Sequence, residues 1–158
     1  TEEGKAVFTS KAALNEFDGT SQKLHGLIDL EKNLIDFYLD LNTLETGIGL
    51  RDRHMRENYL ETDQFPFAEF TGKMITVPSL QNPDWQEVSV EGTFKIHGVE
   101  KQIQLAGKLK NDGNDILKLQ ADFELLLGDF DIDIPKLVFY ELAEKQLIHI
   151  EADLKLQN

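Results

Sequence analysis

The most constraining feature of this sequence is an alternation of apolar and polar residues with a period of two. In IDFYLDLN (35–42), Ile35, Phe37, Leu39 and Leu41 share one face, and polar or amphipathic residues occupy the other. The pattern recurs in VSVEGTFKI (88–96), LKLQADFEL (117–125), DFDIDI (129–134) and IHIEADLKL (148–156), and less regularly in GKAVFTS (4–10), KLHGLIDL (23–30), AEFTGKMITV (68–77) and VEKQIQLAGKL (99–109). Successive side chains of a strand point to opposite faces, so the sequence predicts about nine strands, each with one buried face.

Turn signals separate several of these segments. Asp112-Gly113 in KNDGND is a strong hairpin signal, and LEKN (30–33) and IHGVEK (96–101) are further candidates. Antiparallel strands joined by short turns must bury their apolar faces against one another. A sandwich or a closed barrel achieves this, and closure also removes exposed sheet edges. We therefore expect a single all-β antiparallel domain over residues 1–158.

Two segments break the alternation. LRDRHMRENYLETDQFP (50–66) concentrates charged residues around Met55 and Tyr59, whose spacing of four predicts a short amphipathic helix. In PKLVFYELAEKQ (135–146), Pro135 would begin a second helical turn. VPSLQNPDWQE (77–87) contains two prolines, which predict a loop.

The size of the inward-facing residues leaves two interpretations of the interior open. Small residues occupy many inward positions, namely Ala6, Gly26, Ala68, Gly72, Gly92, Gly107, Ala121 and Ala152. In an eight-stranded barrel they would leave a cavity for one small ligand, lined by the larger Phe8, Phe37, Phe70, Phe94, Phe123 and Phe130. Alternatively, the glycines mark corners of a strongly curved sheet around a filled core. The clean strands carry no inward charge, so any cavity would be apolar and would suit a hydrocarbon chain.

Composition narrows the possible partners. The chain has 16 Lys and Arg against 29 Asp and Glu, a formal net charge of −13. Such a surface repels phosphate backbones and anionic headgroups, which argues against nucleic-acid binding and electrostatic docking on membranes. No apolar run is long enough for a membrane helix, so we expect no stable membrane insertion. The absence of cysteine excludes disulfides, thiolate nucleophiles and Cys-ligated metals.

Candidate catalytic and metal-binding residues form no recognisable motif. The cluster from Arg51 to Glu57 holds acids, a base and cations, but Asp52 and His54 lie on different sides of a helix, whereas Asp52 and Arg56 can form an i,i+4 ion pair. We therefore expect a solvated helix here, with headgroup contact by Arg51, Arg53 or His54 as the alternative. His25, His97 and His149 fall at outward or turn positions, without metal-ligand spacing. We expect solvent-exposed or turn histidines, no catalytic residue, no metal and no cofactor.

Two stretches resemble the YceI-like polyisoprenoid-binding proteins. In LNTLETGIGLRDRHMRENYLETDQFPFAEFTGK (41–73), the positions that match the family's Thr-rich turn, Arg-Asp-x-His helix and Phe-Pro strand are Thr43, Thr46, Arg51, Asp52, His54, Met55, Phe65, Pro66 and Phe70. VEGTFKIHGVEKQIQL (90–105) is similar to the family's hairpin at Gly92, Phe94, Ile96, Gly98 and Val99. The chain departs from the pattern at Glu100, where the family has Thr, and in LLLGDFDIDIP (125–135), which only loosely matches a family Arg-x-x-Phe-Gly segment.

This resemblance implies an all-β, lipocalin-like, up-and-down barrel with one or two short helices, whose lumen binds a long isoprenoid lipid such as a quinone or prenyl chain. It also implies a periplasmic or secreted protein. Because the chain begins at Thr1 without a methionine or a signal-like segment, we expect a signal peptide to have been removed.

The resulting prediction is non-catalytic binding or carriage of an isoprenoid or other long-chain lipid by a monomer or homodimer. The predicted ligand contacts are Phe37, Leu39, Phe70, Val90, Phe94, Leu119, Phe123, Ile132 and Ile150, with Arg51 and His54 near the headgroup. Two alternatives stay open: a hydrolase or isomerase acting on a lipophilic substrate in the same barrel, which needs polar inward residues, and a filled-core interaction protein that uses its acidic outer face.

Overall fold

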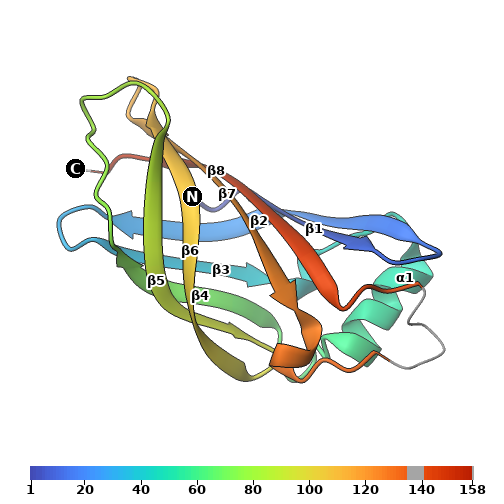
Figure 1. The fold of residues 1–158 in the computed structure, drawn as a ribbon. Coiled ribbons are helices and arrows are strands. Elements are labelled where there is room, and N and C mark those ends of the chain that lie inside the picture. The colour runs from blue at the N-terminus through green and yellow to red at the C-terminus, as the bar shows by residue number, and fades with distance from the viewer. Residues whose placement is uncertain (135–140, 158) are drawn as a thin grey trace.

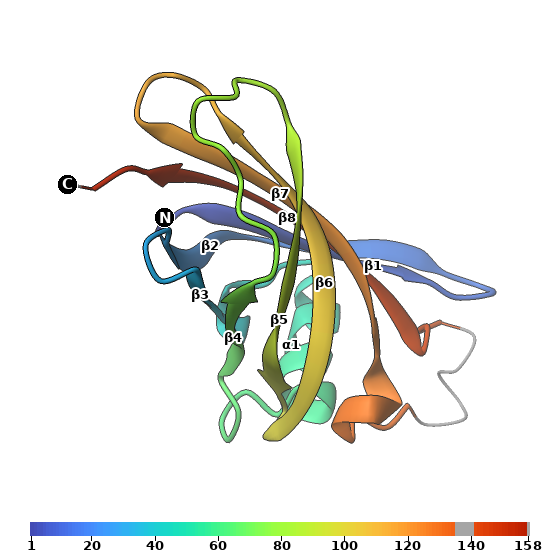
Figure 2. The same cartoon turned by 60° about the vertical axis from the view of Figure 1, so that its left-hand side comes forward.

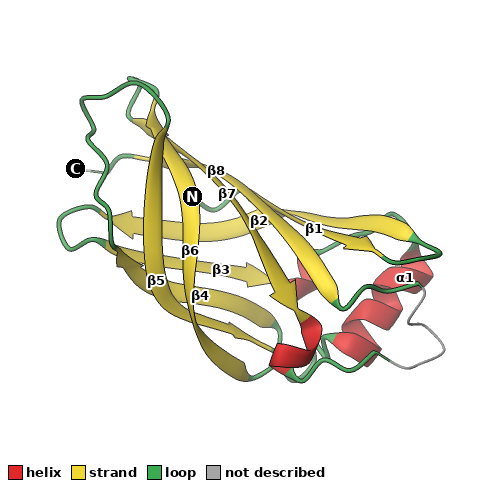
Figure 3. Ribbon diagram, viewed as in Figure 1, coloured by secondary structure: helices red, strands yellow, loops and turns green. Residues whose placement is uncertain are grey.

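The strands close into an antiparallel barrel in which each strand pairs with its neighbours in sequence. The structure is a computed structural model that describes residues 1–134 and 141–157, and over these residues it contains eight strands (Figures 1 and 3). Their bounds are β1 (Gly4–Lys11), β2 (Glu16–Asp29), β3 (Leu34–Asp40), β4 (Phe67–Met74), β5 (Gln86–Ile96), β6 (Val99–Asn111), β7 (Ile116–Leu126) and β8 (Lys145–Lys155). β1 pairs with β8, which closes the sheet and confirms the predicted fold class.

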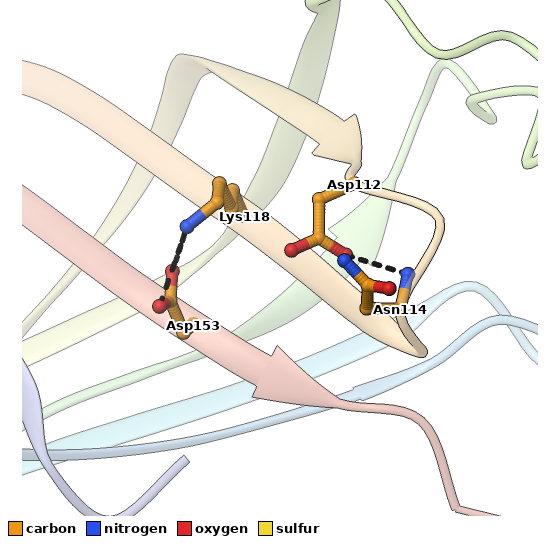
Figure 4. Close-up of polar contacts among 4 residues, drawn as sticks. All are labelled: Asp112, Asn114, Lys118 and Asp153. Carbon is orange, nitrogen blue, oxygen red and sulfur yellow. Dashed lines mark hydrogen bonds and ion pairs between the residues drawn. The ribbon is translucent and has the colours of Figure 1, made fainter.

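The predicted turns connect the strands. His97 and Gly98 both have positive φ, 55° and 73°, and form the two-residue connection between β5 and β6, as a tight hairpin requires. Asp112-Gly113 lies in the β6–β7 turn, where Gly113 has a φ of 82°. Asn114 donates its backbone N–H to the Asp112 carboxylate in this turn, and the Lys118–Asp153 ion pair joins β7 to β8 beside it (Figure 4).

One predicted strand is wrong. DFDIDI (129–134) does not extend the sheet: a 3₁₀ turn, η3 (Leu127–Phe130), is followed by Asp131 in the left-handed conformation with a φ of 56°. This turn buries Phe130 and Ile132 almost completely, and the Phe130 ring packs edge-on against Phe94. The alternation of DFDIDI therefore reports two apolar anchors of a loop that folds against the barrel.

The predicted amphipathic helix forms as α1 (Gly49–His54), followed by a π-helical turn, η2 (Met55–Tyr59). The buried Asp52 carboxylate accepts hydrogen bonds from the Thr46 backbone N–H (2.8 Å) and hydroxyl (2.5 Å), so it anchors the start of α1. The expected Asp52–Arg56 ion pair is therefore wrong, and the i,i+4 pair on this segment is Arg53–Glu57.

The predicted second helix is not seen where the structure describes it. Residues 135–140 of PKLVFYELAEKQ lie outside the described residues, 141–144 form a turn and bend, and β8 begins at Lys145. No helix within residues 1–134 and 141–157 combines the length and the apolarity needed to cross a bilayer.

The two ends of the barrel differ. Both chain termini and the β6–β7 turn lie at one end, whereas α1 lies at the other, near the β1–β2 hairpin (Figures 1 and 2). Near the termini, Leu109, Leu117, Ala152 and Leu154 are buried, and Leu109 is only 1% exposed. Side chains thus fill the interior of the barrel at the end where the two chain termini lie.

Candidate functional site

The barrel encloses a cavity of about 500 Å³ that extends toward helix α1. Leu24, Met74, Val88 and Leu109 line it on the side of the packed termini end, and Leu44, Leu50 and Met55 line it beside the helix. Residues of all eight described strands contribute to the wall, and most of these residues are aliphatic or aromatic. The volume is within the range of about 300–1,000 Å³ that is typical of small-molecule sites.

All the predicted ligand contacts line this one cavity. They are Phe37, Leu39, Phe70, Val90, Phe94, Leu119, Phe123, Ile132 and Ile150, together with Arg51 and His54. The alternation of the strands brings eight of the nine apolar residues to the inner face, and the ninth, Ile132, reaches it from the loop after η3. Contact between these residues and a ligand stays a prediction.

The small inward residues have three different roles. Ala6, Ala68 and Ala121 line the cavity, so they do leave space there. Gly107 also lines it, but a Cβ on this residue would lie 3.0 Å from the backbone carbonyl oxygen of Gln120 on β7. Gly72 and Gly92 are instead paired across β4 and β5, where a Cβ on either residue would overlap the backbone of the opposite strand. That pair marks a corner of the sheet, as the alternative interpretation predicted.

Gly26 is a third case, because the ring of Phe37 lies over it. The two residues are paired across β2 and β3, and a Cβ on Gly26 would overlap the Phe37 ring. Because Gly26 has no side chain, the Phe37 ring can lie flat against the barrel wall at this position, and the space is filled by the ring rather than added to the cavity.

The cavity opens between helix α1 and the β1–β2 hairpin. Ile48 and Leu50 line it and are nevertheless 50% and 62% exposed, so they lie at its rim. Asn15 lines it from the hairpin, and Phe17 follows on β2. The Arg51 guanidinium lies over the Phe17 ring, a cation–π contact that places a positive charge at the entrance of an apolar cavity.

The polar residues of the cavity wall gather near this opening. Tyr59, Glu141 and Gln146 line the cavity along with Arg51 and His54. Burial raises the pKa of the Tyr59 phenol and the negative charge of Glu141 raises it further, so Tyr59 is a hydrogen-bond donor rather than a base at neutral pH. The sequence analysis missed Gln146, although it continues the alternation of β8 two residues before Ile148.

His25, His97 and His149 lie at the predicted outward and turn positions. His97 lies in the predicted turn, but its side chain is only 10% exposed: Nδ1 is 3.0 Å from the Phe130 carbonyl oxygen, and Nε2 is 2.5 Å from Glu61 Oε2. It ties the β5–β6 turn to η3 and to the segment after η2. His149 lies on the outer face between Asp122 and Glu151, and His25 stacks on Tyr38.

Over residues 1–134 and 141–157, no group of three or more His, Cys, Asp or Glu side chains is arranged to hold a metal ion. What the arrangement supports chemically is burial of an apolar molecule in a mostly apolar wall that includes a few polar and cationic groups.

Comparison with known proteins agrees with the architecture. The polyisoprenoid-binding domain of Saccharophagus degradans superposes with a TM-score of 0.85 at 18% identity over 99% of this chain and 95% of its own. BcnA of Burkholderia cenocepacia superposes with a TM-score of 0.81 at 12% identity over 96% of both chains. At these identities the likeness concerns the fold.

Sequence comparison identifies relatives in the same family. Protein YceI of Salmonella arizonae and that of Salmonella newport are each 26% identical over 104 residues, which covers 62% of this chain. The match spans about half (51%) of the length of these relatives. The YceI-like domain matches residues 1–156, nearly the whole chain. The chain therefore belongs to the YceI-like domain family.

Proposed function

We propose that this protein binds and carries a long-chain isoprenoid or a similar lipid without catalysis. The observation that carries the proposal is the apolar cavity of about 500 Å³ inside a closed barrel. Each buried methylene contributes about 0.8 kcal/mol, so a few isoprene units against Phe37, Phe70 and Phe94 would give useful affinity after the cost of ordering the chain. The polyisoprenoid-binding domain of Saccharophagus degradans has the same fold, which supports this choice of ligand.

In this proposal the hydrocarbon chain lies along the cavity and its polar head stays near the opening. Leu119, Phe123 and Ile150 would contact the chain from β7 and β8, and Arg51 and His54 would contact the head from α1. Since the head would meet the few polar groups of the wall, it would set the orientation of the ligand while the apolar surface sets most of the affinity.

The proposal places the protein in the periplasm or outside the cell, as the family resemblance implies, acting as a monomer or homodimer. A carrier of this kind needs no cofactor. The competing hydrolase or isomerase would need an acid–base pair facing the substrate; burial and the charge of Glu141 raise the pKa of Tyr59, so this residue stays a protonated phenol at neutral pH.

The direct test is identification of a bound lipid. Protein purified without detergent would be extracted with organic solvent, and both the extract and the intact complex would be examined by mass spectrometry. We expect an isoprenoid in the extract at a stoichiometry near one per chain, and a matching mass difference in the native spectrum. Protein that carries no lipid and takes up none from isoprenoid-containing vesicles would refute the proposal.

A further inference from the structure

The β1–β2 hairpin at the cavity opening carries apolar residues where turns usually carry polar ones. Ala12, Ala13, Leu14 and Asn15 connect the two strands, and the Ala12 backbone N–H donates to the Asn15 carbonyl oxygen at 2.9 Å. Turns favour Gly, Pro, Asn, Asp and Ser, yet three of these four residues are apolar. Leu14 is 78% exposed, more than any other large apolar residue in the described part of the chain.

The start of the helical segment shows a similar exception. Ile48 is the N-cap residue of α1, a position at which Ser, Thr, Asp and Asn are strongly preferred. Ile48 and Leu50 are exposed and line the cavity, as does Asn15 beside Leu14. The hairpin and α1 lie at the same end of the barrel (Figures 1 and 2). Leu14, Ile48 and Leu50, called the rim residues below, therefore border the same opening.

The two elements that border the opening carry no net charge, although the chain as a whole is strongly acidic. Residues 11–18 and 48–59 hold four Lys and Arg against four Asp and Glu, including all three arginines of the chain, so the formal charge of −13 belongs to the other residues. An acidic surface is repelled by the phosphates of a membrane. That repulsion is weak at the end where the rim residues lie.

Three exposed apolar side chains on two elements suit a lipid bilayer better than a protein partner. A stable protein interface needs about 800 Å² on each partner, from roughly 20–30 residues. Apolar side chains that enter the boundary between headgroups and acyl chains need no complementary surface. A second copy of the chain seated on the opening would also block the passage of a ligand.

We infer that the rim residues dock the opening of the barrel onto the surface of a bilayer of zwitterionic lipids. This inference rests on the proposed function and adds the place at which the lipid is exchanged, because a prenyl tail could pass between bilayer and cavity without crossing water. Burial of apolar side chains supplies the attraction, so docking should persist in about 0.5 M NaCl, which screens charges beyond a few ångströms.

The test is flotation of the delipidated full-length protein with vesicles of phosphatidylcholine and phosphatidylethanolamine. We expect the native protein to float with the vesicles, and Leu14→Asn to lower the partition coefficient about tenfold, since the inserted leucine is lost. Asparagine suits a turn, which preserves the hairpin. Val77→Asn is the matched control and should float like the native protein, because Val77 is 59% exposed in the β4–β5 connection, at the end of the barrel with the termini (Figures 1 and 2).

A second measurement separates docking from ligand binding. Among the described residues, the cavity wall includes Asn15 but not Leu14, so Leu14→Asn should bind a fluorescent prenyl probe in solution as tightly as the native protein does. No flotation of the native protein, flotation lost at high salt, or equal flotation of Leu14→Asn and Val77→Asn would overturn the inference. A dimer in sedimentation that Leu14→Asn disrupts would also overturn it, since a second copy would then cover this end. Flotation of a native protein that binds no prenyl probe would instead count against the proposed function and leave docking intact.

Discussion

The guanidinium carbon of Arg51 lies 4.1 Å from the centre of the Phe17 ring. Arg51 belongs to α1 and Phe17 to β2, so this contact joins the helix to the strand that leads from the β1–β2 hairpin. Both residues line the cavity at the side where Ile48 and Leu50 are exposed. The contact therefore holds together the two elements that border the opening.

Replacing Arg51 with Gln should speed ligand exchange. A cation–π contact at a partly exposed site contributes about 0.5–1 kcal/mol, which corresponds to a roughly two- to fivefold faster release rate if the helix and hairpin must separate. Stopped-flow release of a fluorescent prenyl probe measures this rate. Arg53→Gln is the control, because Arg53 pairs with Glu57 on the exposed side of the helix. Equal release rates in the two variants would show that the Arg51–Phe17 contact does not restrict the opening.

Filling the cavity at Ala121 should reduce lipid binding without unfolding the barrel. Ala121 lines the cavity from β7, and a phenylalanine there would occupy space proposed for hydrocarbon. Exclusion of two methylenes alone is worth about 1.6 kcal/mol, or more than tenfold in affinity. The measurement is lipid recovered per protein in Ala121→Phe and in Gln120→Phe, its outward-facing neighbour. Undiminished recovery in a folded Ala121→Phe protein would place the lipid elsewhere.

Gly72→Ala should destabilise the barrel. The added Cβ would overlap the backbone of β5 at Glu91 and Gly92, and a backbone obstacle cannot change rotamer. Overpacking of this kind costs about 1–3 kcal/mol in the free energy of unfolding, measured by urea denaturation. Gly49→Ala provides the matched control, since a Cβ there meets nothing within 4 Å and lies in α1, and it should be neutral or slightly stabilising. A neutral Gly72→Ala would mean that the strands separate readily at this corner.

The stability contributed by His149 should depend on pH. Its hydrogen bonds to Glu151 and to Asp122 raise its pKa above the ordinary value of 6.5, while the hydrogen bond from His149 lowers the pKa of Glu151 below 4.5. A raised histidine pKa gives stability that is fully present below pH 6.5 and is lost as pH rises through the folded-state pKa. The Glu151 contribution is present above pH 4.5 and is lost as pH falls through its folded-state pKa.

Chemical denaturation of His149→Gln across pH 4–9 tests this dependence. The difference from the native protein should be largest between about pH 4.5 and 6.5 and should stay below about 1 kcal/mol, because the group is partly exposed. The difference should shrink at alkaline pH. His25→Gln, at a histidine stacked on Tyr38, serves as the comparison. A difference that grew with rising pH would contradict the assignment.

The strands and most of the cavity wall could be predicted because alternation reports which side chains are buried. The alternation alone predicts that Phe37 and Leu39 on β3 and Phe94 on β5 face the interior. The same rule failed at DFDIDI, since burial of Phe130 and Ile132 by a 3₁₀ turn and a left-handed Asp131 leaves the same pattern as a strand. Local alternation records burial, and the backbone path depends on tertiary contacts.

The features that were missed depend on contacts between distant segments. The burial of His97 requires Glu61 and the Phe130 carbonyl group, which the fold brings together from separate parts of the chain. The orientation of the Gln146 side chain is set by the hydrogen bond that its Nε2 donates to the Ala143 carbonyl oxygen. Whether a small residue leaves space in the cavity, as Ala121 does, or allows two strands to approach closely, as Gly92 does, is decided by the neighbouring strand.

The packing of Leu109, Leu117 and Leu154 at the termini end has a consequence for the direction of transfer. A prenyl chain seated in the cavity would meet Leu109 with its far tip, and the packed leucines behind it would keep the chain from advancing further. The head of the ligand would therefore enter solvent first when the ligand is released, and it would enter the cavity last when the ligand binds. An acceptor membrane or enzyme would therefore meet the cargo by its head, and a tail longer than the bore would leave the head outside the entrance.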